Sequence, residues 1–338
     1  MGQWVAALRR RFALRGRPVH YCAAMQVSSA LVLCAGLGTR LRPLTDERPK
    51  PLIPVNDRPL AAHALGRLAS VGVRDVVANA FHLATQVEPA LRPWADRHAQ
   101  SLRVLVEPTL LGTGGAIRNA LPHLGDDFVV FNGDVLAAPD LSRAVDHHRR
   151  TNALLTLVLR DDPRAARLGA IEVDAEGRVR RILGEGDPPG VPVRACVFTG
   201  VYVVSRRVAD DLPTEGCVVR HTLRRLLARG DFVGGVVDDG AWHDLGTPER
   251  YAEAQFALLR GELQGFPPGP PGAVWVAPTA VIDPGVHLEG PCIVGENARV
   301  HGEGTLSRAI VWPDAALDTP RSNVIVARTA RVPIGDVR

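Results

Sequence analysis

The chain has 338 residues, of which 46% are apolar and 22% charged, and no apolar run is long enough to cross a membrane. This composition is typical of a soluble globular protein, and the length predicts a large domain with a smaller one attached. Five arginines and no acid stand in residues 1–25, so the formal charge of +4 leaves −1 for the rest of the chain. A near-neutral body argues against a nucleic-acid partner, as the apolar pattern argues against a membrane.

Residues 1–25 do not have the pattern of a signal peptide, because no apolar stretch of adequate length follows their arginines. We expect Met25 to be the true start, with a disordered basic arm as the alternative. The five cysteines are scattered, odd in number and include no Cys-x-x-Cys pair. They favour reduced thiols in a cytoplasmic protein over a disulfide or zinc framework.

The first predicted strand, residues 30–33, is an apolar run that leads into small residues and glycines. Gly36 and Gly38 allow the backbone to approach a ligand closely and to present its N–H groups to an anion. Arg40 and Lys50 bring two positive charges to the same loop, and prolines on both sides hold the lysine in an extended segment. The pattern predicts a binding loop for a polyphosphate.

Lys50 is the only lysine in a chain with 39 arginines. It is therefore a candidate for a position that needs a compact point charge rather than a planar guanidinium. The alternative is that one lysine escaped a general drift of lysine codons to arginine. A dinucleotide-binding Gly-x-Gly-x-x-Gly turn is disfavoured, because Leu41 takes the place of its third glycine and the loop continues through prolines.

Residues 33–45, followed by Pro49-Lys50-Pro51, resemble the signature of the sugar-1-phosphate nucleotidyltransferases. The likeness extends over about residues 26–334. Members of this family attach a nucleotidyl group from a nucleoside triphosphate to a sugar 1-phosphate and release pyrophosphate. The resemblance implies catalytic roles for Arg40, on the β- and γ-phosphates, and for Lys50, across the α-phosphate and the sugar phosphate. It implies nucleotide contacts by Leu33, Ala35, Gly36, Gly38 and Thr39.

Helical and strand patterns alternate after the loop. Such alternation predicts an α/β fold with a Rossmann-like mixed, mostly parallel sheet, helices on both faces and a ligand at the carboxyl ends of the strands. The predicted helices are 59–71, 114–121, 141–150, 219–229 and 248–260. The predicted strands are 74–78, 103–107, 128–131, 154–159 and 233–237, with a more antiparallel region at 170–173, 179–183 and 196–204.

Residues 107–117 are rich in glycine, which allows a flat base to lie against their backbone. From the resemblance we expect Glu107, Gly112 and Thr113 to bind the nucleotide. A carboxylate only accepts hydrogen bonds, so Glu107 suits the two neighbouring N–H groups of guanine. It can also accept from the single N3–H of uracil, and some uridylyltransferases of the family have glutamate here. GTP is therefore favoured over UTP only slightly.

Two aspartates are candidate metal ligands. Asp134 follows the predicted strand 128–131, and Asp244 follows Trp242 and His243. An aspartate in such a place is commonly a turn or cap residue. Both segments, however, resemble metal-binding segments of the family, so we expect the two carboxylates to hold Mg²⁺, or Mn²⁺ in its place, together with nucleotide phosphates. By strand alternation His243 is expected to point the other way and to be structural.

The resemblance places the sugar contacts at Gly169, Glu172, Glu185 and Thr199. Members of the family often have a lysine that meets the sugar phosphate where this chain has Gly186, and an asparagine where it has Thr199. These departures resemble the N-acetylmuramate-1-phosphate uridylyltransferases and some mannose- or heptose-1-phosphate guanylyltransferases. The identity of the sugar stays open between these branches.

The predicted catalytic domain, residues 26–260, is followed by a Pro/Gly-rich linker, 261–273, and a repeat over 274–334. Apolar residues recur at six-residue spacing, which is the signature of a parallel β-helix; they are Val276, Ile282, Leu288, Val294, Val300 and Leu306. Six such repeats predict about two coils, and the resemblance implies left-handed ones. We expect this tail to be a packing or homo-oligomer surface, because so short a helix has little room for an acetyltransferase cleft. A non-catalytic regulatory subunit of the same fold is the remote alternative, disfavoured because Arg40, Lys50 and both aspartates are present.

Overall fold

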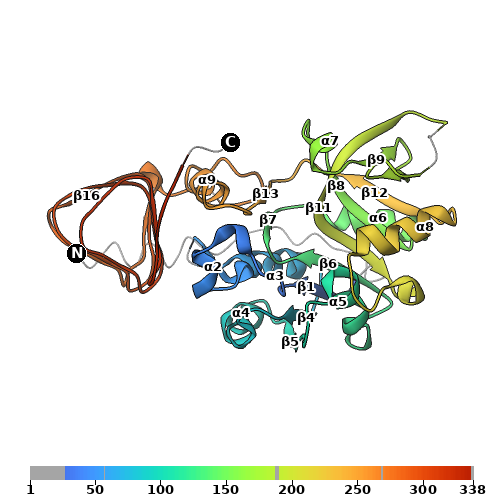
Figure 1. The fold of residues 1–338 in the computed structure, drawn as a ribbon, viewed down its shortest axis with the longest axis horizontal. Coiled ribbons are helices and arrows are strands. Elements are labelled where there is room, and N and C mark those ends of the chain that lie inside the picture. The colour runs from blue at the N-terminus through green and yellow to red at the C-terminus, as the bar shows by residue number, and fades with distance from the viewer. Residues whose placement is uncertain (1–26, 57, 187–189, 268, 336–338) are drawn as a thin grey trace.

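The computed structural model of the chain describes residues 27–56, 58–186, 190–267 and 269–335. Figure 1 shows a layered body of sheet and helices beside a triangular coil of strands. Within the described ranges, no helix is both long and apolar enough to cross a membrane. The predictions made for residues 1–25 lie outside the described residues.

A mixed, mostly parallel sheet forms the centre of the body, in the order β12-β8-β11-β6-β1-β4-β5. Only β11 runs against its neighbours β6 and β8 in this order. The two short strands β9 (Ile171–Asp174) and β10 (Val179–Ile182) extend the sheet from the first half of β11. The central strands are β1 (Ser29–Leu33), β4 (Asp75–Ala80), β5 (Ser101–Val106), β6 (Asp127–Asn132), β8 (Leu155–Arg160), β11 (Val193–Ser205) and β12 (Val233–Val237).

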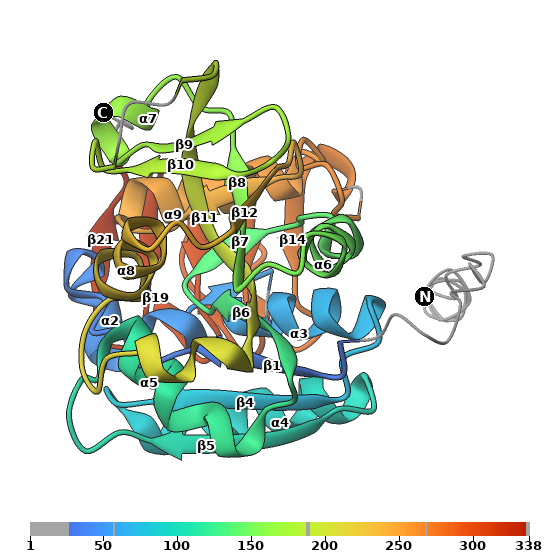
Figure 2. The ribbon, with the colours of Figure 1, turned by 90° about the vertical axis from the view of Figure 1, so that its right-hand side faces the viewer.

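Helices cover both faces of this sheet, as Figure 2 shows. Alternate residues of β1 divide the interior into two cores: Ala30 and Val32 pack on one side and Leu31 on the other. The first side is covered by α3 (Leu60–Ser70), α4 (Val87–Arg97) and α6 (Leu141–Arg150), and the second by α5 (Gly112–Ala120) and α8 (Arg224–Ala228). The predicted α/β class is therefore confirmed.

Two elements differ from the sequence-based expectation. Helix α4 (Val87–Arg97) was not predicted, because Pro93 lies inside it and because its exposed residues combine prolines with charged side chains. The predicted helix 219–229 begins as a π-helix, Val218–Leu223, before α8.

The other short elements are α2 (Leu44–Glu47), α7 (Ala165–Leu168), β2 (Pro54–Val55), β3 (Arg58–Pro59), β7 (Val135–Ala137), β13 (Trp242–Asp244) and 3₁₀ turns at Thr39–Leu41, Lys50–Leu52, Ala84–Gln86, Leu121–His123, Arg206–Asp211 and Pro271–Ala273.

The C-terminal strands stack in parallel, as expected for a β-helix. One face consists of β14 (Val274–Val276), β16 (Val286–Val294), β18 (Gly304–Val311) and β20 (Val324–Val326), and another of β15 (Val281–Ile282), β17 (Arg299–Val300) and β19 (Ala316–Leu317). The antiparallel strand β21 (Arg331–Pro333) closes the first face. Four strands on one face exceed the predicted two coils. Val294, Val300 and Leu306 are buried as the repeat predicts, whereas Val276 at the open end is exposed.

One buried core joins the β-helix to the body. Tyr251 and Phe256 of α9 (Pro248–Leu259) pack in the same cluster as Trp312 of the β-helix. Leu44 and Ile53, which stand on either side of Lys50 in the sequence, belong to that cluster too. The domain boundaries at 260 and 273 stay predictions, and the β-helix lies directly against α9 and the loop region.

Candidate active site

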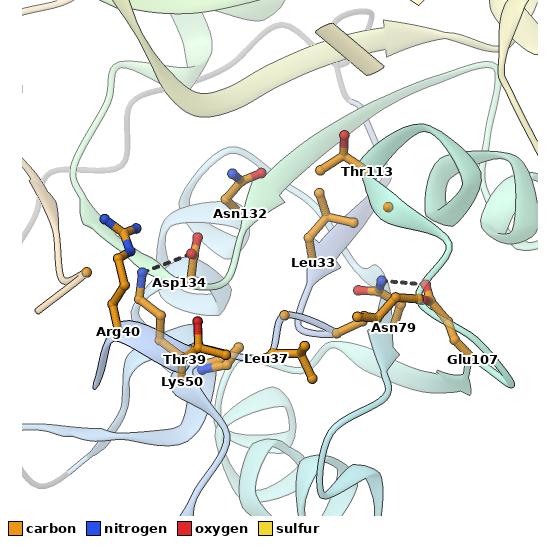
Figure 3. Close-up of a pocket in the computed structure, with 17 residues that line it drawn as sticks. Leu33, Leu37, Thr39, Arg40, Lys50, Asn79, Glu107, Thr113, Asn132 and Asp134 are labelled. Atoms are coloured by element: carbon orange, nitrogen blue, oxygen red, sulfur yellow. Dashed lines mark hydrogen bonds and ion pairs between the residues drawn. The ribbon is translucent and has the colours of Figure 1, made fainter. Parts of the chain in front are cut away.

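A cavity of about 440 Å³ lies at the carboxyl ends of β1 and β6. Figure 3 shows Arg40, Lys50 and Asp134 at one end of it and Glu107 at the other. It brings together the predicted catalytic and nucleotide-binding residues and one of the two predicted metal ligands. These are Leu33, Ala35, Gly36, Gly38, Thr39, Arg40, Lys50, Glu107, Gly112, Thr113 and Asp134.

The glycine loop is folded tightly around Gly38, whose φ of +62° favours glycine. A Cβ at this position would lie 2.9 Å from Cγ2 of Thr45 and 3.0 Å from Cβ of Lys50. The Thr45 hydroxyl donates a hydrogen bond to the Gly38 carbonyl at 3.0 Å. The close packing around this glycine therefore sets the position of the lysine segment.

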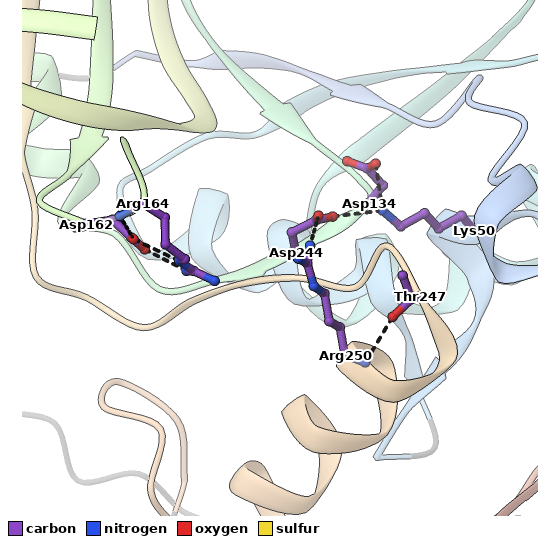
Figure 4. Close-up of polar contacts among 7 residues, drawn as sticks. All are labelled: Lys50, Asp134, Asp162, Arg164, Asp244, Thr247 and Arg250. Atoms are coloured by element: carbon purple, nitrogen blue, oxygen red, sulfur yellow. Dashed lines mark hydrogen bonds and ion pairs between the residues drawn. The ribbon is translucent and has the colours of Figure 1, made fainter. Parts of the chain in front are cut away.

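The Lys50 ammonium lies between two carboxylates from distant parts of the chain. Its Nζ is 2.9 Å from Oδ2 of Asp134 and 3.3 Å from Oδ1 of Asp244, and the residue is only 5% exposed. Pairing of β7 with β13 places Asp244 opposite Val135, next to Asp134. Figure 4 shows Arg250 reaching from α9 to the same aspartate, with Nη1 at 3.2 Å from Oδ2.

The donor set at this point fits a divalent cation that is also held by its substrate. Among the described residues, no group of three or more His, Cys, Asp or Glu side chains is placed to hold a metal. Two converging carboxylates are the arrangement of a site completed by phosphate oxygens and water, as Mg²⁺ prefers. Asp134 and Asp244 are therefore suited to a metal–nucleotide complex.

The opposite end of the cavity is fixed by the buried side chain of Glu107. Its two carboxylate oxygens accept hydrogen bonds from Nδ2 of Asn79 at 2.7 Å and from the backbone N–H of Leu111 at 3.1 Å. Asn79 in turn accepts from the backbone N–H of Cys34 at 2.7 Å. The Asn79 side chain thus connects the glycine loop to the predicted base pocket, a link that no motif in the sequence indicated.

Backbone packing holds the start of α5 beside this end of the cavity. Gly112 has a φ of +69°, and a Cβ there would lie 2.6 Å from the Gly216 carbonyl oxygen. The Thr113 hydroxyl accepts from the N–H of Val218 at 2.9 Å. These two predicted nucleotide residues are therefore also needed for the local structure.

A second cavity of about 400 Å³ adjoins the first, and both are lined by Asn132 and Asp134. Two arginines that no motif indicated, Arg164 and Arg250, line its wall. Arg164 binds Asp162 through Nε at 2.8 Å and Nη2 at 2.6 Å and holds the pKa of that carboxyl at about 2. The other lining residues are Val135, Val197, Phe198, Thr199, Gly200, Trp242, His243, Asp244 and Glu253.

His243 lines the second cavity as well, although strand alternation predicted that it points away from the site. Burial, with Arg160 and Arg164 nearby, lowers the pKa of its imidazole. A histidine that stays neutral in the physiological range fits a structural role better than that of a charged phosphate contact.

The predicted sugar contacts do not come together. Thr199 lines the second cavity and donates from its hydroxyl to the Val158 carbonyl at 2.8 Å. Glu172 instead pairs with Arg181 at 3.3 Å. Neither Gly169 nor Glu185 lines either of the two cavities, and Glu185 pairs with Arg224.

Comparison with known proteins agrees with the geometry. A profile of the family described as "Nucleotidyl transferase" matches residues 29–261. The chain is 38% identical over 300 residues to the mannose-1-phosphate guanylyltransferase of Mycobacterium tuberculosis, covering 84% of this chain and 79% of that one. It is 28% identical to the UTP–glucose-1-phosphate uridylyltransferase of Synechocystis, covering 85% and 79%.

The fold is similar to that of a solved structure, HddC from Yersinia pseudotuberculosis in complex with GMP-PN. The TM-score is 0.56 at 23% identity, and the match covers 68% of this chain and 98% of that one. The fold, the signature loop and the family match agree. The chain belongs to the nucleotidyl transferase family.

Proposed function

We propose that the chain transfers a guanylyl group from GTP to mannose 1-phosphate, or to a closely related heptose 1-phosphate, with release of pyrophosphate. The observation that carries the proposal is the position of Lys50, between two carboxylates where the two cavities meet. The identity of 38% to a relative described as a mannose-1-phosphate guanylyltransferase supports the choice of substrates. Uridylyl transfer to another hexose or to N-acetylmuramate 1-phosphate is the alternative, and the Synechocystis relative favours it.

In the proposed reaction, a phosphate oxygen of the sugar 1-phosphate forms a bond to the α-phosphorus of the triphosphate. The bond from that phosphorus to the bridging oxygen breaks, and its electron pair leaves with pyrophosphate. The nucleophile is already an anion near neutral pH, so no strong general base is needed. The protein has to hold two mutually repelling anions in line and offset their charge. We assign that task to Arg40 and Lys50.

Enzymes of this family generally use a divalent metal ion. We propose Mg²⁺, with Mn²⁺ as a substitute, held by Asp134 and Asp244. When bound, the ion neutralises phosphate charge. Lys50 keeps the two carboxylates converged, because its ammonium is hydrogen-bonded to both.

We further propose that Arg250 and Arg164 bind the sugar phosphate in the second cavity. The chain has Gly186 where related enzymes often have a lysine for this purpose, so another cation is needed. Both arginines line the cavity that adjoins the nucleotide cavity at Asp134. Arg250 has the stronger case, since it also contacts Asp244 at 3.2 Å.

The test is pyrophosphate release by the purified chain with each of the four nucleoside triphosphates and a panel of sugar 1-phosphates. GTP with mannose or heptose 1-phosphate should give the highest kcat/KM, and a preference for UTP would replace the guanylyl proposal by its alternative. Arg250→Ala should raise KM for the sugar phosphate about tenfold or more, and by more than it raises KM for the nucleotide. Arg194→Ala is the matched control, because Arg194 pairs with Asp161 at 3.6 Å and lines neither cavity.

Self-association through the β-helix and a cytoplasmic location belong to the proposal too. The described cysteines are free thiols, which supports a cytoplasmic location; they are Cys34, Cys196, Cys217 and Cys292.

A further inference from the structure

The β-helix contacts the segment that carries Lys50 through a buried chain of hydrogen bonds. Nε1 of Trp312 donates to the hydroxyl of Tyr251 at 2.9 Å, and this hydroxyl donates to the carbonyl of Pro54 at 2.6 Å. Both aromatic side chains are fully buried, and their rings meet edge to face, with centroids 6.4 Å apart. The guanidinium of Arg48 lies over the Trp312 ring, 5.9 Å from its centroid. Residues on both sides of Lys50 are thus attached to the β-helix.

A second contact reaches the same segment from the end of the tail. The Glu47 carboxylate, whose side chain is 6% exposed, accepts from the backbone N–H of Thr329 at 3.1 Å and from its hydroxyl at 3.2 Å. Arg328 lies 3.8 Å from the other carboxylate oxygen. A buried carboxylate that is hydrogen-bonded to the β-helix fixes the end of α2, three residues before Lys50.

The β-helix also contacts the helix that holds the second carboxylate. Arg308 of β18 pairs with Glu253 of α9 at 3.2 Å. One turn earlier on α9, Arg250 binds Asp244, which is a partner of Lys50. The β-helix therefore contacts the segment that carries Lys50 and also α9, whose Arg250 binds Asp244. Lys50 and Asp244 are far apart in the sequence.

We infer that the β-helix is a positioning element of the active site, which holds the Lys50 segment against Asp244. The inference rests on the proposed function for its kinetic readout. It predicts that weakening the contacts with the β-helix lowers turnover while the fold is retained. A tail that serves only for packing or assembly would leave turnover unchanged well below the melting temperature.

Tyr251→Phe and Glu47→Ala test the inference in the full chain. The first keeps the ring but leaves the Trp312 N–H and the Pro54 carbonyl unpaired and buried, and the second removes the acceptor for Thr329. The matched control is Asp283→Asn, because the hydrogen bonds of Asp283 to Gly302 and His301 stay within the β-helix. Steady-state kinetics with the preferred substrates should show kcat lower by about tenfold in both test variants, with smaller changes in KM, and parental values in the control.

A second readout needs no activity. Lys50 is the only lysine and is 5% exposed, so its rate of acylation by an amine-directed reagent, followed by mass spectrometry, reports how firmly its segment is held. Both test variants should be acylated at Lys50 several-fold faster than the parent, at a temperature where circular dichroism shows them folded. Parental acylation and turnover in both variants would overturn the inference, as would an equal effect of Asp283→Asn. Faster acylation in both variants, together with a parent that transfers no nucleotide, would support the positioning role and reject the proposed function alone.

Discussion

Replacing Lys50 by arginine keeps the charge but changes the shape of the cation, and we expect it to impair turnover strongly. The lysine reaches two carboxylates with one ammonium, at 2.9 and 3.3 Å. Its stem runs beside Gly38, where even an added Cβ would lie 3.0 Å from Cβ of Lys50. A planar guanidinium is wider than an ammonium, so we expect it to lose the position between the two carboxylates.

The expected size of the effect follows from the loss of one of these two contacts. A hydrogen bond to a charged group contributes about 1.5–3 kcal/mol. If that contribution is made in the transition state, kcat should fall by about ten- to a hundredfold. Melting temperature and circular dichroism should stay close to those of the parent, since both side chains are cations.

The assay is initial-rate pyrophosphate release at saturating substrates, with Arg92→Lys as the control. Arg92 is a half-buried arginine of α4 that pairs with Glu88 at 2.5 Å and lines neither cavity. The control should keep parental turnover. Turnover of Lys50→Arg within about threefold of the parent would refute the requirement for a point charge.

Three further predictions concern the metal, the base and pH. Asp134→Asn and Asp244→Asn should each remove most of the activity, and excess chelator should do the same to the parent; activity in chelator would exclude the two-carboxylate site. Glu107→Gln places an amide donor against buried donors, so kcat/KM for GTP should fall about ten- to a hundredfold and UTP should suffer less; equal losses would leave Glu107 a positioning role only. Burial and Arg58 lower the pKa of His63 to about 3. As the pH falls, the unfolded chain therefore takes up this proton first. The free energy of unfolding is unaffected by His63 above about pH 6.5 and is lower by about 2 kcal/mol at pH 5. In urea unfolding, the free energy of unfolding of His63→Gln should depend less steeply on pH than that of the parent. An equally steep dependence would contradict the lowered pKa of His63.

Local patterns predicted most of the fold. The apolar runs that became β1 and β6 were visible because strands buried on both faces need them, and the glycine loop was visible because its chemistry lies in one stretch. The β-helix has more coils than predicted because its spacing shortens: Val274 pairs with Cys292, but Cys292 with Ala309 and Ala309 with Val324. A strict six-residue search ends where this shortening begins.

The residues that line the two cavities were predictable only where they lie in continuous motifs. Arg164 and Arg250 were missed because two arginines among 39 carry no signal until the fold places them beside a cavity. Asn79 was missed for a similar reason, since its role depends on contacts with residues before and after it in the sequence. The expected sugar residues Glu172 and Glu185 each pair with an arginine, and only the tertiary structure shows this.

The most direct test of the central claim follows the phosphates of the nucleotide. The purified chain is incubated with mannose 1-phosphate, Mg²⁺ and GTP that is radiolabelled on either the α- or the γ-phosphate, and the products are separated. Nucleotidyl transfer predicts that the α-label appears in a sugar nucleotide and the γ-label in pyrophosphate, with neither product formed when the sugar phosphate is omitted. Release of the γ-label as orthophosphate, or no labelled sugar nucleotide with any triphosphate and sugar 1-phosphate of the panel, would contradict it.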